Sequence, residues 1–151
     1  MKKASLLRLI NFWPPYLGSG VKVTHISSDM RSIDVRMDLK FWNRNYVGVH
    51  FGGSLYAMTD PFFMLMMMEN LGPDYIVWDK AATIRFKKPG KGRVHAKFNL
   101  AQEDIDSVKA TADSEQKAEP VFSVTVVDSA GDIVAEIDKT IYVRRKDRKR
   151  P

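Results

Sequence analysis

The chain has 151 residues, of which 44% are hydrophobic, and this suits a single domain with a buried core. The absence of cysteine excludes disulfides, thiolate metal sites and thiol catalysis, and it favours a cytoplasmic protein. The formal charge of +6 is concentrated in residues 144–151, so the rest of the chain is nearly neutral and does not indicate a nucleic-acid partner. We expect one domain over residues 1–143 and a basic tail over residues 144–151.

The first predicted element is a short amphipathic helix over residues 3–12, which we expect to cover one edge of the core. Pro14 and Pro15 are expected to end it. Its apolar side chains recur at the spacing of one helical face: Leu6, Leu9, Ile10 and Trp13.

Alternating apolar and polar residues predict the strands. Residues 21–27 and 32–39 predict a hairpin with a turn at residues 28–31. Four more strand segments follow later in the chain, over residues 76–87, 93–102, 120–127 and 133–143. Between the second and third of these, residues 103–115 have the spacing of a surface helix.

An apolar helix is predicted over residues 54–71, ended by Gly72 and Pro73. Its longest apolar run, Pro61–Met68, is far shorter than the roughly 20 residues that a membrane span needs. Pro61 is expected to bend the helix by freeing a backbone carbonyl. Since little of this helix is polar, the strands are predicted to form a curved antiparallel sheet wrapped around it, which is an α+β fold.

Gly52 and Gly53 precede this helix, and Asp60 lies inside it. A buried carboxylate needs a partner or a solvated niche, so Asp60 is either a structural ion pair or a functional group. The glycine N–H groups at the helix start could polarise a carbonyl oxygen, or the glycines could serve only a tight turn. Because about 10 Å of helix separates Gly53 from Asp60, a second copy would have to supply the carboxylate for the same carbonyl. This predicts a site shared across a homodimer.

The segment from Asn45 to Asp60 resembles a motif of the hotdog-fold acyl-CoA thioesterases of the phenylacetyl-CoA type. Their motif is Asn, then Gly, then His-Gly-Gly, with an acidic residue seven positions after the last glycine. The matching residues here are Asn45, Gly48, Gly52, Gly53 and Asp60. Phe51 stands at the family's His position, and His50 lies one place earlier. Over residues 5–144 the chain is also similar to a related, largely uncharacterised group of bacterial hotdog proteins that are described as thioesterases.

The resemblance implies catalytic roles for Asp60, Gly53, Gly52 and Asn45. Asp60 would act as a general base on water or attack the thioester carbonyl directly, and the sequence leaves both routes open. Gly52 and Gly53 would stabilise the oxyanion. Asn45 would orient the water or the thioester, although loop asparagines also form turns through local hydrogen bonds.

Other residues are candidates for substrate binding. His50, Phe51 and Ser54 adjoin the glycine pair. A basic hairpin over residues 87–93 is either a solvated loop or a site for the phosphates of coenzyme A; its cationic residues are Lys87, Lys88, Lys91 and Arg93. The three histidines lack metal-ligand spacing, so no metal is expected, and no cofactor is implied.

The sequence therefore predicts a cytoplasmic homodimeric hotdog thioesterase, or a dimer of dimers, acting on an acyl-CoA-like thioester. A noncatalytic acyl-CoA or fatty-acyl binding module is the first alternative, because Phe51 replaces the family's histidine. A dehydratase would need a catalytic histidine, for which only His50 is near. An RNA-associated protein acting through its tail would show steep salt dependence.

Overall fold

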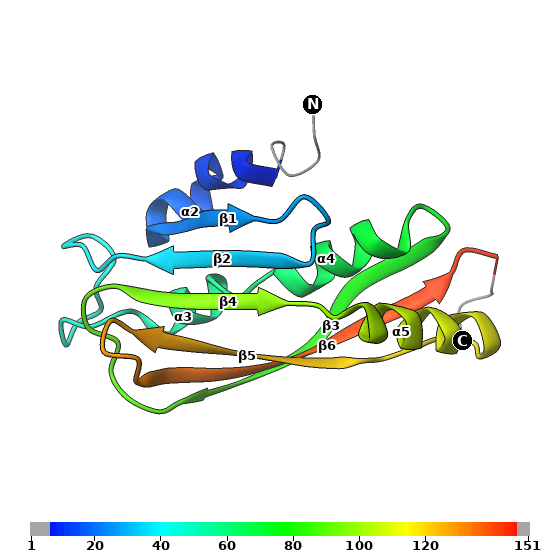
Figure 1. The fold of residues 1–151 in the computed structure, drawn as a ribbon. Helices are drawn as coiled ribbons and strands as arrows, with labels where there is room; N and C mark the ends of the chain where they lie inside the picture. Colours follow the sequence, from blue (N-terminus) through cyan, green and yellow to red (C-terminus); the bar gives the residue numbers. More distant parts are fainter. Residues whose placement is uncertain (1–6, 148–151) are drawn as a thin grey trace.

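The computed structural model describes residues 7–147, which form one six-stranded antiparallel sheet with helices on one face and at its edges (Figure 1). The strand order is β1-β2-β4-β5-β6-β3. In chain order the elements are η1 (Arg8–Phe12), α2 (Pro14–Ser19), β1 (Val21–Ile26), β2 (Ser32–Met37), α3 (Gly52–Ala57), α4 (Phe62–Leu71), β3 (Tyr75–Phe86), β4 (Val94–Asn99), α5 (Gln102–Ser114), β5 (Val121–Asp128) and β6 (Ile133–Arg145).

The apolar helix α4 packs against the sheet and forms the centre of the core. Phe62 is fully buried, with its ring 5.1 Å from that of Phe98 on β4 and 6.2 Å from that of Tyr16 on α2. Another side of α4 is less covered, since Met68 is 37% exposed. The α+β class and the central apolar helix are confirmed.

The central helix consists of two parts, α3 and α4, joined by a turn at residues 58–61. Pro61 has no N–H group for a helical hydrogen bond, so the chain turns before α4 begins. The Tyr16 hydroxyl donates to the carbonyl oxygens of Ala57 (3.3 Å) and Asp60. The prediction that Pro61 bends the helix is confirmed, and the helix is in fact interrupted. The predicted separation of about 10 Å between Gly53 and Asp60 assumed one continuous helix, so it does not apply.

The N-terminal segment differs from the prediction. Residues 3–6 of the predicted helix lie outside the described residues, and Arg8–Phe12 is a 3-10 helix. Pro14 and Pro15 also begin a second helix, α2, because the first turn of a helix leaves its N–H groups unbonded and therefore tolerates proline. Asn11 bonds to both the N–H (2.7 Å) and the carbonyl (3.1 Å) of Val23, and so occupies part of the outer edge of β1.

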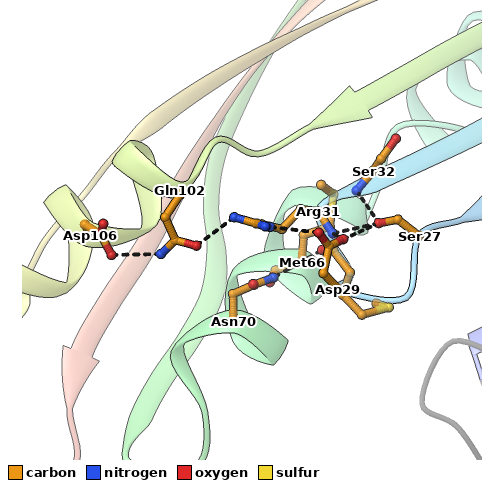
Figure 2. A network of polar contacts seen from close by, with 9 residues as sticks. Ser27, Asp29, Arg31, Ser32, Met66, Asn70, Gln102 and Asp106 are labelled. Carbon is orange, nitrogen blue, oxygen red and sulfur yellow. Dashed lines mark hydrogen bonds and ion pairs between the residues drawn. The ribbon is translucent and has the colours of Figure 1, made fainter.

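A polar network ties the predicted β1–β2 turn to α4 and α5 (Figure 2). The Arg31 guanidinium binds Asp29 (3.0 Å) and the Gln102 side chain (2.6 Å). Asn70 of α4 donates to the Met30 carbonyl (3.2 Å). The predicted surface helix is present as α5, with its inward side chains Ile105, Val108 and Ala112 buried. The network fixes the end of the sheet that α5 covers.

The predicted basic tail is only partly described. Arg144 and Arg145 belong to β6 and pair with Ile76 and Tyr75 of β3, so the sheet extends two residues into the segment predicted as a tail. Residues 148–151 lie outside the described residues, and the division into domain and tail remains a prediction. None of the helices between Leu7 and Asp147 is long and apolar enough to cross a lipid bilayer.

Candidate functional site

Asp60 lies in the turn between α3 and α4 and forms an ion pair with a lysine from the sheet. Its Oδ1 atom is 2.9 Å from Nζ of Lys139, a β6 residue whose side chain is only 1% exposed. The Asp60 side chain is 44% exposed, so part of the carboxylate is accessible to water. Asp60 is therefore both an ion-pair partner and an open carboxylate, and the two predicted roles do not exclude each other.

A second carboxylate, Asp79 of β3, shares the same lysine. Asp79 Oδ2 lies 3.1 Å from Lys139 Nζ. A β-bulge at Lys80 shifts the β3–β6 register just after Asp79, a distortion that is common beside functional sites. Burial raises the pKa of Asp79 from 3.8 to about 6, and the neighbouring Asp60 carboxyl adds to this, while Lys139 opposes it.

Tyr56 completes this group, since its hydroxyl oxygen accepts a hydrogen bond from Lys139 Nζ at 3.0 Å. Burial alone would lower the pKa of Lys139, but its hydrogen bonds to Tyr56 and Asp60 and the charges of both carboxylates outweigh burial and raise it. We call Tyr56, Asp60, Asp79 and Lys139 the carboxylate cluster. Tyr56 and Asp79 line a hollow of about 470 Å³ together with Lys80, Ala81, Ala82 and Ile84 of β3.

The sequence analysis missed Lys139, Asp79 and Tyr56, although the sequence contains a signal for each. Lys139 lies on the same inward-facing side of the strand as Ile137 and Ile141. A charge among buried apolar residues requires a partner. Asp79 likewise continues the inward-facing set that begins with Tyr75. Tyr56 precedes Asp60 by four residues, which is the spacing of one helical face.

The glycine pair begins α3, as predicted, with Gly52 and Gly53 as its first two residues. The N–H groups of Ser54 and Leu55 bond to the Phe51 carbonyl, whereas those of Gly52 and Gly53 have no acceptor between residues 7 and 147. A Cβ atom at Gly52 would lie 3.1 Å from the Phe86 ring, so this position is crowded as well as open to hydrogen bonding. The unbonded N–H groups fit an oxyanion site and the crowding fits close packing, but neither glycine has the positive φ of a tight turn.

Asn45 organises the loop before α3. Its side-chain oxygen accepts from the N–H groups of Val47 and Val49, both at 3.1 Å, and its own N–H donates to the Val49 carbonyl at 2.7 Å. The turn-forming role of Asn45 is therefore present. The Asn45 side-chain amide nitrogen donates to no acceptor in the described part of the chain and could still contact a ligand.

His50 is 2% exposed and bonded into the basic hairpin. Its Nε2 lies 2.6 Å from the Gly92 carbonyl, so this nitrogen is the donor and Nδ1 has no partner among the described residues. Burial lowers the pKa of His50, which keeps the ring neutral. Phe51 is 58% exposed, whereas Ser54 is buried in the first turn of α3.

The cations of the basic hairpin are mostly paired with carboxylates of this chain. Lys88 binds Asp128 and Asp132, both at 2.9 Å, and Arg93 binds Asp38 at 2.5 Å. Lys87 lies 3.5 Å from Glu136. Lys91 is exposed and has no ion pair with any residue from 7 to 147. The hairpin thus resembles a salt-bridged surface loop, with Lys91 the cation most available to a phosphate group.

The predicted site residues fall into two groups in one chain. Asn45, His50, Gly52, Lys87 and Lys88 line a common hollow of about 410 Å³, which we call the glycine hollow. Asp60 belongs instead to the carboxylate cluster, beside a different hollow. Neither of these two hollows is lined by both Asp60 and the glycine pair.

A family model described as a domain of unknown function, DUF4442, matches residues 2–143. The chain belongs to the DUF4442 family. No curated protein sequence matches it.

Solved structures with the same fold include several proteins described as thioesterases. A Pseudomonas aeruginosa protein of unknown function, described as a probable thioesterase, is 21% identical with a TM-score of 0.81, over 93% of this chain and 95% of that chain. A Haemophilus influenzae thioesterase is 14% identical with a TM-score of 0.70, over 100% and 96%. A mutant of the phenylacetic acid degradation protein PaaI from Thermus thermophilus is 23% identical with a TM-score of 0.58, over 87% and 98%. The hotdog fold of this DUF4442 protein, and its resemblance to the phenylacetyl-CoA-type group, are thereby confirmed.

Proposed function

We propose that this DUF4442 protein is a thioesterase that hydrolyses an acyl-CoA-like thioester, with Asp60 as its catalytic carboxylate. The observation that carries the proposal is an open carboxylate held by a fully buried lysine beside a hollow. The buried ammonium group of Lys139 needs a carboxylate partner, because leaving it unpaired would cost several kcal/mol, and this ion pair holds Asp60 in place. The shared fold with proteins described as thioesterases supports the same reaction class.

In the general-base route, the Asp60 carboxylate removes a proton from water while the water oxygen bonds to the thioester carbonyl carbon. The carbonyl oxygen becomes an oxyanion, which the N–H groups of Gly52 and Gly53 would stabilise. The C–S bond then breaks, and the departing thiolate takes up a proton. Direct attack by Asp60, giving an acyl-enzyme anhydride, remains the second route.

The site is proposed to form between two copies of the chain. Within one chain the glycine hollow and the carboxylate cluster are separate, so the glycine pair of one copy would meet Asp60 of the other. Between Ile76 and Phe86, β3 pairs with β6 on one side, and none of the described residues pairs with its other side. An open strand edge of this length favours pairing with a second copy.

The substrate class is proposed from the same features. The half-exposed apolar side of α4 suits an acyl chain, and Lys91 suits a coenzyme A phosphate. Whether the carrier is coenzyme A or acyl carrier protein would be decided by a thiol-release assay across acyl-CoA chain lengths, aryl-CoA esters and acyl carrier protein thioesters.

A noncatalytic acyl-binding module is the second candidate. It is favoured because His50 is buried and hydrogen-bonded within the chain. The family's histidine position holds the exposed Phe51, and the His50 ring is buried and bonded to Gly92, so neither position of the motif offers a histidine that is free to act on a substrate. Binding of an acyl-CoA without thiol release would favour this module. The same geometry argues against a dehydratase that depends on His50.

Replacing Asp60 with Asn tests the proposal, because it keeps the size of the side chain and removes the base. We expect kcat for thiol release to fall by at least about 10²-fold, with substrate binding retained. Asp74→Asn, at an exposed aspartate before β3, is the matched control and should retain wild-type activity. Unchanged turnover in a folded Asp60→Asn variant would contradict the assignment.

A further inference from the structure

The buried ammonium group of Lys139 has a partner for each of its protons. Nζ lies 2.9 Å from Asp60 Oδ1, 3.1 Å from Asp79 Oδ2 and 3.0 Å from the Tyr56 hydroxyl oxygen. Since an ammonium group has three N–H donors and no acceptor, the direction of each bond is fixed. Lys139 donates to Tyr56, and Tyr56 cannot donate to Lys139.

The hydroxyl hydrogen of Tyr56 is therefore not hydrogen-bonded to any described residue. The Tyr56 oxygen is occupied as an acceptor, and its O–H group has no acceptor among residues 7–147. The Tyr56 ring is also held over the lysine, with Nζ 5.1 Å from the ring centroid. The tyrosine is therefore a hydrogen-bond donor that is held in place.

The surroundings define what Tyr56 could bind. Tyr56 lines the hollow beside β3, whose other polar side chains are Asp79 and Lys80. Lys80 is already bound to Glu119 at 2.5 Å. With two carboxylates around one buried ammonium group, this side of the hollow disfavours an anionic group such as a phosphate. An uncharged oxygen acceptor, such as a carbonyl, fits it better.

We propose that the Tyr56 hydroxyl donates a hydrogen bond to the acyl carbonyl oxygen of the bound thioester, and that Lys139 is the positioning residue that directs it. This inference rests on the proposed thioesterase function. Asp60 and Tyr56 contact the same lysine nitrogen, so the base and the carbonyl donor stand side by side. Tyr56 would then be an additional donor to the oxyanion, supplied by the chain that also supplies Asp60.

The test combines a change in the protein with a change in the ligand. The first probe is an acyl-CoA analogue in which a methylene group replaces the thioester sulfur, so that it keeps the carbonyl and resists hydrolysis. The second probe is the same molecule with that carbonyl reduced to a methylene group. Both are made with hexanoyl, dodecanoyl and phenylacetyl chains, and their binding is measured by calorimetry to the wild type and to Tyr56→Phe.

We expect the wild type to prefer the carbonyl probe over its reduced partner by at least about 3- to 10-fold, the typical contribution of one hydrogen bond. Tyr56→Phe should show a preference about 3- to 10-fold smaller than the wild type, because only the glycine N–H groups would then bind the carbonyl, and it should bind the reduced probe as the wild type does. In thiol-release assays, kcat of Tyr56→Phe should fall by about 10²-fold, as when one oxyanion donor is removed.

Two further variants separate positioning from structure. Tyr142→Phe makes the same chemical change on β6, at a buried hydroxyl without a partner among the described residues, and should keep the carbonyl preference. In Lys139→Met, the Tyr56 hydroxyl can turn towards the carboxylates, so the preference should fall as it does in Tyr56→Phe although the tyrosine is present. Asp79→Asn added to Lys139→Met removes the like-charge contact and provides a second variant if Lys139→Met does not fold.

The outcomes distinguish this inference from the proposed function. A smaller preference in Tyr56→Phe than in the wild type, without any thiol release by the wild type, would support the Tyr56 contact and overturn hydrolysis. A preference as large in folded Tyr56→Phe as in the wild type would overturn the Tyr56 contact, whether or not thiol is released. A wild type that binds none of the probes would overturn both.

Discussion

Lys139 is the residue on which the candidate site depends. A buried ammonium group is tolerated only because two carboxylates and a hydroxyl oxygen satisfy it, and removal of a partner from such a pair typically costs about 3–5 kcal/mol. The same contacts fix the positions of Asp60 and Tyr56. Structure and proposed function therefore rest on one side chain.

The pH dependence of stability provides a prediction for Asp79. Its pKa is raised from 3.8 to about 6 by burial and then by Asp60, so between these pH values the folded protein holds more protons than the unfolded chain. Stability should therefore fall as pH rises through this window, and Asp79→Asn should remove this loss, on the order of 2 kcal/mol. Melting temperatures of both proteins from pH 3 to 8 would measure the difference.

Asp29 is a control with the opposite sign. Hydrogen bonds from Ser27 and Arg31 lower its pKa from 3.8 to about 2, so its contribution to stability is present above pH 4 and is lost as pH falls towards 2. Asp29→Asn should differ from the wild type in that lower window instead. Identical pH profiles for the wild type and Asp79→Asn would show that Asp79 does not bind an extra proton in the folded state.

At the scale of elements, the turn between α3 and α4 places the catalytic candidate. Pro61 ends the first helical segment, and the short helix α2 holds the resulting turn through the Tyr16 hydroxyl. Burial, and secondly Asp60, raise the pKa of Tyr16, so the hydroxyl remains protonated and can donate. An N-terminal element thus positions a residue in the middle of the chain.

Tyr16→Phe should therefore affect both stability and activity. The carbonyls of Ala57 and Asp60 would lose a buried donor, which is expected to cost about 1–3 kcal/mol. We expect kcat to fall several-fold, because Asp60 is less firmly held. Chemical denaturation and thiol-release assays would measure the two effects, with Tyr142→Phe as the control. An activity loss without a stability loss would mean that Tyr16 does not act through the turn.

At the scale of the whole molecule, the two edges of the sheet differ. Asn11 blocks part of the β1 edge by bonding to Val23, whereas the β3 edge is uncovered within the described residues. The β3 edge also borders the hollow beside the carboxylate cluster. The proposed composite site requires a second copy seated at this edge, with its glycine pair facing Asp60.

Mixing two inactive variants tests the composite site. Gly53→Pro removes one candidate oxyanion N–H at a first-turn position where proline breaks no helical hydrogen bond, and the nearest obstacle is the exposed Phe51 ring. Mixed with Asp60→Asn, it should regenerate activity, because one of the two sites in a heterodimer has an intact glycine and an intact aspartate.

Two checks accompany this mixing experiment. Gly53→Pro must fold, as circular dichroism would show, and native mass spectrometry must detect the heterodimer. If verified heterodimers are no more active than the two parents together, the shared-site hypothesis is wrong.

The sequence by itself determined the order of the elements, the apolar central helix and the position of Asp60, because these depend on local periodicity and on a motif that is contiguous in the chain. Only the tertiary structure decided that Asp60 meets Lys139, Asp79 and Tyr56, since these residues come from β6, β3 and α3 and are joined by strand register and a bulge. It also decided that Asn45 and His50 are bonded to the backbone and that Lys88 and Arg93 are neutralised by carboxylates distant in sequence. The physical reason is that a buried charge is stable only where non-local partners converge, and one-dimensional spacing does not specify which strands will be neighbours.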